Sequence, residues 1–369
     1  MSDNILTKFD RYLAPDGPAA LVIQEQLIPA EGADAIFFPA TYAASEDKTF
    51  KGGYNIDSFA DGTNITLVDS VGSQSNRIEP LFKAGDYAAL VPQIVIKAGE
   101  KEINLLDAGH RAGDAVVRYS ALQSELQAAF KALLNGDASP LAQIAPTSLV
   151  FGVWDSRDTQ AKAPRLVAST IRAHNVKSLT RSAQYWAGGD SAPKTVYDSE
   201  SVLGPIPEGK ESKKETDARS NCGFTHVPAT ASHGGVIAGE KGITRTATLA
   251  LAALRLLSSS SAEETLKLRR YILGLALVAF TKLPGGYLRQ GTILVSNGEA
   301  KIEEVAANGT RTNANLTHEA VLKYAQEAAG NFGIKTAKEK WEKDPVSFDV
   351  KAAKAAIETA KKKKASSAA

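Results

Sequence analysis

The side chains best suited to chemistry in this sequence are cations and aromatic rings gathered between Ser148 and Gln184. Guanidinium groups bind phosphates bidentately, aromatic rings stack on bases, and amides and hydroxyls bond to sugars and base edges. Trp154 lies among the cations, which outnumber the two aspartates of the segment. The segment therefore predicts a surface for single-stranded nucleic acid and not a reaction centre. Its cations are Arg157, Lys162, Arg165, Arg172, Lys177 and Arg181.

A structural role is the alternative for this segment, because arginines on an exposed strand also keep a sheet edge soluble. Two features favour binding. Trp154 places an aromatic ring in a polar turn. In the strand expected over Ser169–Val176, alternation puts Arg172 and His174 on one face and the intervening apolar residues toward the core.

A second cluster lies at the start of a helix expected over Ala112–Leu134. Arg111, Asp114 and Arg118 are three and four residues apart, which places them on one helical face where Asp114 can pair with both arginines. The cluster is either a surface ion-pair ladder or a phosphate clamp whose arginines Asp114 positions. No nucleophile or metal ligand stands beside His110, so we expect no catalysis here.

Two glycine-rich turns are weaker candidates. The glycines of Gly285–Gly291 allow backbone amides to approach a phosphate, and Arg289 lies between them, although a tight entry into a strand has the same pattern. Arg77 follows a polar glycine turn and suits a loop or a contact equally well.

Metal and cofactor sites are not expected. Cys222, His226 and His233 match no standard zinc spacing and lack a fourth ligand. The sequence has neither a phosphate-binding G-x-x-x-x-G-K-[ST] loop nor a G-x-S-x-G nucleophile turn.

Composition favours a folded, cytoplasmic protein without a membrane segment. The 369 residues are 43% hydrophobic, and 43 basic against 41 acidic side chains leave a net charge of only +2. Any nucleic-acid site is therefore a local patch. One cysteine suits a reducing compartment, and the apolar Leu266–Leu283 stretch is too charged for a membrane span and predicts a buried helix.

The expected fold class is α+β. Glycine, proline and serine supply 18 of the 55 residues of Ala187–Lys241, which we interpret as an inserted, projecting arm. Strands are expected over Ala20–Ile28, Asn64–Val71, Gln93–Lys97 and Ser148–Val153, helices over Ile243–Leu257 and Ala262–Lys282, a glycine-rich loop and strand over Gly285–Val295, and a mostly helical remainder that ends in the helix Asp349–Lys364.

Four motifs resemble a known family: VGSQSNRIEPLF (71–82), DAGHRAGDAVVRYS (107–120), SLVFGVWDSRDTQAKAPRLVASTIRAHNV (148–176) and LTRSAQY (179–185). They are similar to the CRISPR-associated RAMP-superfamily backbone subunit of type I-G (formerly I-U) Cascade complexes. The resemblance implies a modified RRM/ferredoxin-like palm, an antiparallel sheet with helices that carries inserted finger and thumb segments. The implied parts are the palm over 1–186 and 242–330, the thumb over 187–241, and a helical, lysine-rich tail over 331–369.

The function implied by the resemblance is antiviral. Copies of the subunit line up along a CRISPR guide RNA in a helical filament and present the guide for pairing with target DNA, beside a large subunit and guide-processing or capping subunits. The protein holds RNA and does not cut it. The implied RNA contacts are Arg77, Arg111, Arg118, Trp154, Ser156, Arg157, Gln160, Lys162, Arg165, Arg172, His174, Arg181, Gln184, Gly286 and Arg289.

Two rival functions remain open. A ribonuclease would cut bound RNA with a loop aspartate, for which Asp114, Asp155 and Asp158 are the candidates, although each stands beside an arginine. A free RNA chaperone would bind single strands as a monomer without cooperativity.

Overall fold

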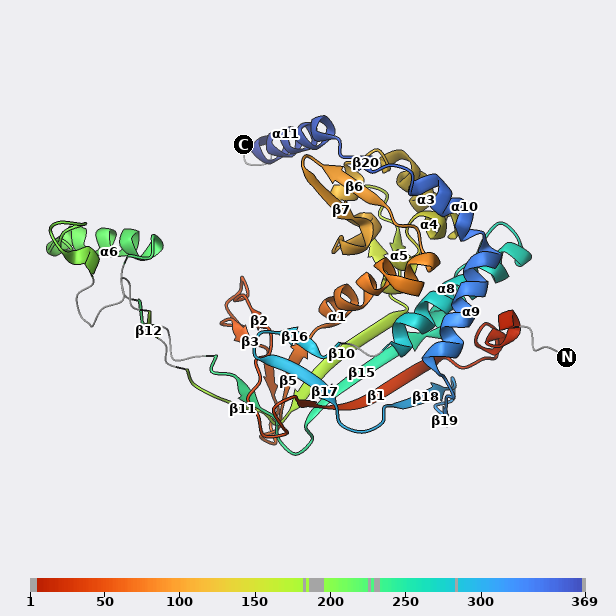
Figure 1. Ribbon diagram of the computed structural model, residues 1–369, viewed down its shortest axis with the longest axis horizontal. Coiled ribbons are helices and arrows are strands. Elements are labelled where there is room, and N and C mark those ends of the chain that lie inside the picture. Colours follow the sequence, from red (N-terminus) through yellow and green to blue (C-terminus); the bar gives the residue numbers. More distant parts are fainter. Residues whose placement is uncertain are drawn as a thin grey trace.

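A nine-stranded antiparallel sheet runs through the protein, and its strands come from distant parts of the sequence. The computed structural model describes residues 5–181, 184–185, 196–224, 227–228, 233–282 and 285–366. The strand order is β16-β17-β1-β15-β10-β5-β4, with β18 also paired to β1 and β19 to β18 (Figure 1). The mixture of helices and antiparallel sheet confirms the α+β class. The bounds are Ala20–Pro29 (β1), Ile56–Ser58 (β4), Asn64–Asp69 (β5), Val167–His174 (β10), Ile243–Ala250 (β15), Tyr287–Arg289 (β16), Thr292–Ser296 (β17), Lys301–Val305 (β18) and Arg311–Asn313 (β19).

Alternating side chains hold the two central strands, β1 and β15, in register. Every second residue of each strand is buried against the core. Glu25 lies directly opposite Arg245, and the two form a buried ion pair between the two apolar clusters of this face. The helix expected over Ile243–Leu257 is therefore wrong: the segment forms β15 and the short helix α7 (Leu251–Leu254). The period-two alternation of ITRTATLA prevails here, because threonine and isoleucine pack well on a pleated surface.

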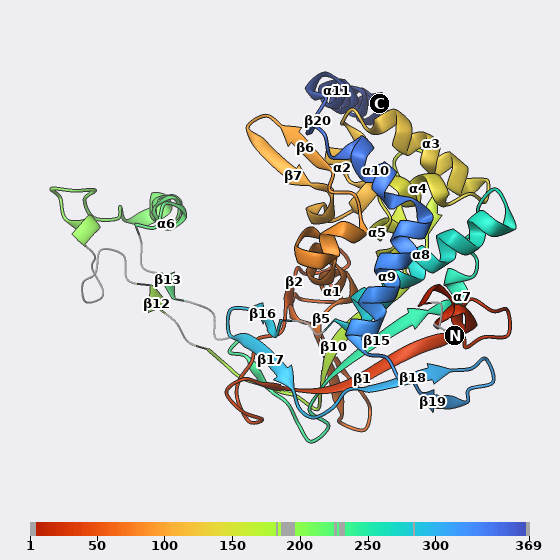
Figure 2. The ribbon, with the colours of Figure 1, turned by 45° about the vertical axis from the view of Figure 1, so that its right-hand side comes forward.

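Helices cover one face of the sheet (Figures 1 and 2). The two longest in this layer, α8 and α9, pack against each other, and α8 is buried along most of its length. This outcome confirms the helix expected over Ala262–Lys282. None of the helices that the structure describes combines the length and the apolar run needed to cross a membrane. The bounds are Val71–Ile78 (α1), Ala115–Arg118 (α2), Gln123–Leu134 (α3), Ser139–Ile144 (α4), Thr147–Phe151 (α5), Ala262–Thr281 (α8), His318–Phe332 (α9) and Ile334–Trp341 (α10).

Two further local expectations are wrong. The single helix expected from Ala112 is split into α2 and α3, because Ser120 between them is buried and pairs with Phe348 from the C-terminal region. The strand expected over Ser148–Val153 is mostly the helix α5, all of whose residues are buried. A segment buried on every side shows no periodicity that separates helix from strand.

The C-terminal region carries strands before its helices. Where a mostly helical remainder was expected, β18 and β19 precede α9. Farther on, β20 (Val346–Ser347) pairs with β6 (Val95–Ala98), which also pairs with β7 (Lys101–Asn104). The helix expected near the C-terminus is confirmed as α11 (Val350–Ser366), which lies at the edge of the molecule (Figure 1). The remaining short pairs are β2 (Thr41–Tyr42) with β3 (Gly53–Tyr54) and β8 (Val153–Trp154) with β9 (Lys162–Ala163).

The segment between β10 and β15 is here called the arm (Lys177–Ile237), and its described residues 196–224 lie away from the sheet (Figures 1 and 2). Its helix α6 (Ser212–Asn221) lies farthest out, where buried Arg219 donates to Glu215 at 2.7 Å and to the carbonyl of Gly204 at 2.8 Å. At the base of the arm, fully buried Val236 packs with the apolar core beside the sheet, so residue 236 does not belong to the projecting part. The paired strands of the arm are β11 (Lys177–Ser178) with β14 (Val236–Ile237) and β12 (Gln184–Tyr185) with β13 (Val227–Pro228).

Candidate nucleic-acid interface

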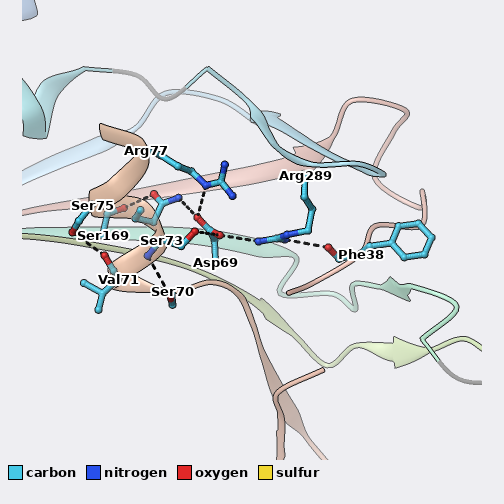
Figure 3. Close-up of polar contacts among 10 residues, drawn as sticks. Phe38, Asp69, Ser70, Val71, Ser73, Ser75, Arg77, Ser169 and Arg289 are labelled. Carbon is cyan, nitrogen blue, oxygen red and sulfur yellow. Dashed lines mark hydrogen bonds and ion pairs between the residues drawn. The ribbon is translucent and has the colours of Figure 1, made fainter. Parts of the chain in front are cut away.

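The carboxylate of Asp69 is the centre of the best-built polar site in the described residues (Figure 3). Asp69 ends β5, and its side chain is completely buried. One oxygen, Oδ1, accepts from Arg289 Nη2 at 2.8 Å and from Ser73 Oγ at 2.9 Å. The other, Oδ2, accepts from Gln74 Nε2 at 2.6 Å and from Arg77 Nε at 3.2 Å. Two arginines from separate elements therefore converge on one buried charge.

Helix α1 brings Arg77 to this carboxylate. Ser70 caps the helix, because its hydroxyl accepts from the amide of Ser73 at 3.2 Å. This cap starts the helix directly after Asp69 and places Arg77 in its last turn. Gln74 ties the helix to β10, since its Oε1 accepts from Ser169 Oγ at 3.0 Å. Helix, carboxylate and sheet are thus joined by buried hydrogen bonds.

The hairpin of β16 and β17 brings Arg289 to the same place. Gly291 has a φ of 73° and stands against the ring of Phe38, where a Cβ would lie 2.6 Å from a ring carbon, so only glycine fits. Gly286 has a φ of 78°. Arg289 Nη1 also donates to the carbonyl of Phe38 at 3.1 Å. Burial lowers the pKa of Arg289 from its ordinary value, while Asp69 acts in the opposite direction.

A pocket of about 400 Å³ opens beside Arg77. Arg77 and the exposed Lys282 supply cations, and Tyr287 presents a ring that is 62% exposed. The glycine backbone at 285–286 lines one side. Cations, backbone amides and an accessible ring are together the groups that bind a nucleotide. The full lining is Gln74, Arg77, Ile78, Leu81, Lys282, Gly285, Gly286, Tyr287 and Leu288.

The turn between β8 and β9 presents a second aromatic ring. Trp154 is 53% exposed, and Lys162 Nζ lies 4.3 Å from the centre of its ring. Asp155 is buried and shapes the turn, because its Oδ2 accepts from the amide and the hydroxyl of Thr159 at 2.9 and 2.7 Å. Arg118 Nη2 donates to the other oxygen of Asp155 at 2.7 Å. Arg118 therefore stabilises this turn through its ion pair with Asp155.

Arg111 also lies inside the protein. It is 5% exposed, and its Nε lies 2.7 Å from Oε2 of the buried Glu79. Burial raises the pKa of Glu79 to about 7, although Arg111 opposes the shift. The guanidinium also donates to the carbonyl of Gly152 at 3.4 Å, so Arg111 supports the backbone that leads into the turn.

The expected pairing of Asp114 with Arg111 and Arg118 is wrong. Asp114 caps α2 through the amide of Val116 at 3.0 Å, while the two arginines pair with other carboxylates. The helical spacing on which that expectation depended does not exist, because residues 111–113 form a 3-10 turn that ends before α2.

Other predicted contacts lie on or near the same turn. Arg157 is exposed and makes no hydrogen bond or ion pair with any residue that the structure describes. Gln160 is exposed, with a φ of 62°, and donates to the carbonyl of Ser156 at 2.7 Å. Arg165 is half-buried and donates to the carbonyl of Phe151 at 3.0 Å, and burial lowers its pKa.

The sheet separates the predicted contacts into two sets. Asp69 lies opposite Ile171 and shares its face with the helical layer. Arg172 is exposed and His174 half-buried on the other face, as the alternation predicted, so the sheet lies between them and the Asp69 site. Arg181 is exposed near the base of the arm, and the side chain of Gln184 lies outside the described residues, as does the whole of His226.

Sequence reasoning missed several residues of the pocket. Asp69, which lies beside the pocket, falls within the strand expected over Asn64–Val71, whereas the observed strand ends at Asp69 and Ser70 caps helix α1. Lys282 and Tyr287 flank the glycine turn, but nothing in their spacing shows that Arg77 lies opposite them. No feature of the sequence indicated that Gln74 belongs to the site.

Residues 21–178 match the model of a family described as CRISPR-associated protein GSU0053. The matched stretch begins in β1, ends in β11 and contains Asp69, Arg77 and Trp154. No curated protein matches the chain. The family match supports a role for this chain as a CRISPR-associated protein.

Proposed function

We propose that this chain is the guide-RNA-binding backbone subunit of a CRISPR effector complex of the type I-G kind. The observation that carries the proposal is the convergence of Arg77 and Arg289 on buried Asp69, beside a pocket with Lys282 and Tyr287. This arrangement offers fixed cations for phosphates and a ring for a base.

The site suits binding that does not depend on the sequence of the RNA. Gln74 is the one amide side chain that lines the pocket, and both ends of its amide are engaged, by Asp69 and by Ser169. It is therefore not free to read the edge of a base. A guide must keep its base edges free for pairing with the target, so contacts to phosphates and ring faces suit the task.

The sheet supports an RRM-like palm. Its strands β1, β10, β15 and β17 or β18, taken in chain order as first to fourth, lie in the spatial order fourth, first, third, second. This order fits a ferredoxin-like arrangement, with α8 between the third and fourth strands and the arm between the second and third. An arm inserted there suits a thumb that reaches toward a neighbouring copy along the RNA.

We also propose that the subunit holds RNA without cutting it. Asp155 has both oxygens engaged by Arg118 and Thr159, and Asp114 caps a helix. Asp158 accepts from Gln127. A metal-dependent cleavage of bound RNA that is lost in Asp155→Ala, in a protein that remains folded, would instead support the ribonuclease.

The test of the proposed function is co-expression with a CRISPR array and the other subunits, followed by measurement of RNA per protein in the purified particle. The parent is expected to carry discrete RNA of spacer-plus-repeat length. Arg77→Ala/Lys282→Ala is expected to lose most of it. Lys97→Ala/Lys131→Ala, which removes two exposed lysines from β6 and α3, is the charge-matched control. Equal RNA content in all three proteins would reject the Asp69 site.

A further inference from the structure

No helix in the described part of the chain covers the face of the sheet turned away from α8 and α9 (Figure 1). Figures 1 and 2 show the helices of the palm on the other side of β1, β10 and β15. Thr246 has a paired strand on each side and still is only partly buried, while Gln24 of β1 is exposed. Solvent therefore reaches the middle of this surface, here called the open face.

Hydroxyl and amide groups form continuous rows across the open face. In one row, Thr246 lies between Thr170 of β10 and Gln24 of β1, and Gln24 lies opposite Lys301 of β18. The next row joins Arg172, Thr244 and Gln26. Arg172 Nη1 donates to Thr170 Oγ1 at 2.8 Å, which keeps its guanidinium on this face.

The open face has an excess of positive charge. Arg172 lies near one end, and Lys301 and Arg311 at the other, with side chains 60% and 46% exposed for the last two. On the described open-face positions of β10, β15, β1, β18 and β19, the one acid is Glu303. It is buried, and Lys301 and Arg311 contact it at 2.7 and 3.0 Å. Beyond β10, the exposed Asp57 of β4 lies on the same face, in the row of His174, so the excess of positive charge is small. Burial lowers the pKa of the nearby His174, and Lys241 and Arg172 act in the same direction.

The spacing of these groups suits a phosphodiester strand. Neighbouring strands lie about 4.8 Å apart, so Arg172 and Lys301 are separated by three intervals, about 14 Å. At about 3.4 Å per nucleotide, the spacing within a strand of stacked B-form geometry, this distance spans about four nucleotides, and a more extended strand covers it with fewer. An acidic protein segment would also pair with the cations, but the neutral donors between them match the sugar and phosphate oxygens of a nucleic acid.

We propose that the open face binds the backbone of a single nucleic-acid strand, separate from the strand held at the Asp69 site. The described positions of the face on β10, β15, β1, β18 and β19 hold no aromatic ring, so the contact is with sugars and phosphates and does not depend on sequence. In an effector complex this surface would hold a second strand while the guide occupies the opposite side.

The test uses the full chain with its Asp69 site disabled by Arg77→Ala/Lys282→Ala, so that its outcome does not depend on guide binding. A fluorescein-labelled 20-mer oligothymidylate is titrated by anisotropy at several salt concentrations. Adding Arg172→Gln/Arg311→Gln is expected to weaken binding about tenfold at 0.1 M salt and to flatten the salt slope by about 1.4, because each lost phosphate contact removes about 0.7. Adding Lys97→Gln/Lys131→Gln is the control and is expected to change the affinity less than twofold.

Three outcomes would overturn the proposal. The first is equal binding of the oligonucleotide by the two quadruple variants, and the second is no binding of it by the Arg77→Ala/Lys282→Ala protein. The third is that Arg172→Gln/Arg311→Gln weakens binding of a labelled polyglutamate but not of the oligonucleotide. A second measurement does not depend on removing charge. A photo-crosslinker attached after Thr246→Cys, with Cys222→Ser, is expected to capture the oligonucleotide, and the same group attached after Lys131→Cys is not. Failure to cross-link at position 246 would also overturn it.

Discussion

Arg77 and Arg289 donate to opposite oxygens of one buried carboxylate, Asp69, although Arg289 is 220 residues away from Asp69 in the chain. Asp69 thereby joins helix α1 to the hairpin of β16 and β17. The carboxylate pairs with both guanidinium groups and fixes their direction but neutralises only one of the two positive charges, while 34% and 23% of the two side chains remain exposed. The site is therefore assembled before any ligand binds.

Replacing the shared carboxylate is expected to weaken both stability and RNA binding. Asp69→Asn removes the charge that two arginines share, and an amide accepts at only one end. We expect a loss of about 2 kcal/mol in the free energy of unfolding, below the range for fully buried pairs because the arginines are partly exposed. Chemical denaturation measures it. Asp57→Asn, on an exposed residue of β4, is the control and should unfold like the parent.

The ring of Tyr287 is expected to stack on a base. Tyr287→Ala should weaken binding of a single-stranded RNA by about 1–3 kcal/mol, whereas Tyr287→Phe keeps the ring and should bind like the parent. Anisotropy titrations with labelled RNA distinguish the two variants. If Tyr287→Phe binds as weakly as Tyr287→Ala, the hydroxyl makes the contact and stacking is refuted.

The turn between β8 and β9 is expected to contribute phosphate contacts. Arg157→Ala and Lys162→Ala should each weaken guide binding and flatten its salt dependence by about 0.7, because each removes one cation from the surface beside Trp154. Lys131→Ala on α3 is the control. Two variants with the affinity and the salt slope of the parent would show that this turn does not meet the guide.

Glu79 is expected to make stability depend on pH. Its pKa is about 7 when buried against an ordinary value of 4.5, so the folded protein binds this proton more tightly than the unfolded chain. The free energy of unfolding should therefore fall as the pH rises from about 4.5 to 7, by roughly 3 kcal/mol at most. Glu79→Gln should be less stable because Arg111 loses its partner, but it should lack this fall.

Denaturation at several pH values between 5 and 8 tests this expectation. Glu102→Gln, on an exposed residue of β7, is the control and should keep the slope of the parent. A Glu79→Gln protein with the parent's slope would show that another group titrates.

Shortening the arm is expected to leave the palm folded. Replacing residues 187–232 by a short glycine-serine linker spares Val236, whereas removing residues 187–241 deletes this core residue. The first variant should unfold at the temperature of the parent but assemble poorly on RNA, and the second should be destabilised. Calorimetry and particle mass measure both. Normal assembly of the first variant would reject a thumb-like role for the arm.

The local sequence pattern predicted the secondary structure correctly where a strand has one buried face or a helix is apolar along most of its length. The β-branched run of β1 predicted a strand, the alternation in β10 predicted a strand and the exposure of Arg172, and the apolar run of α8 predicted a buried helix. Prediction failed where tertiary contacts decided the outcome. The residues of α5 are buried on every side, and β15 took the strand form between two neighbours although a helix was expected.

The sequence by itself determined that this protein carries a cationic and aromatic surface on an α+β scaffold, because residue types and short spacings are local properties. Only the tertiary structure decided which cations share a site. It buried Arg111 against Glu79, brought Arg289 to Asp69, and placed Arg172 on the far side of the sheet. The physical reason is that a buried carboxylate without a cationic partner destabilises the fold. Strand pairing, and not distance along the chain, decides which residues lie near enough to be that partner.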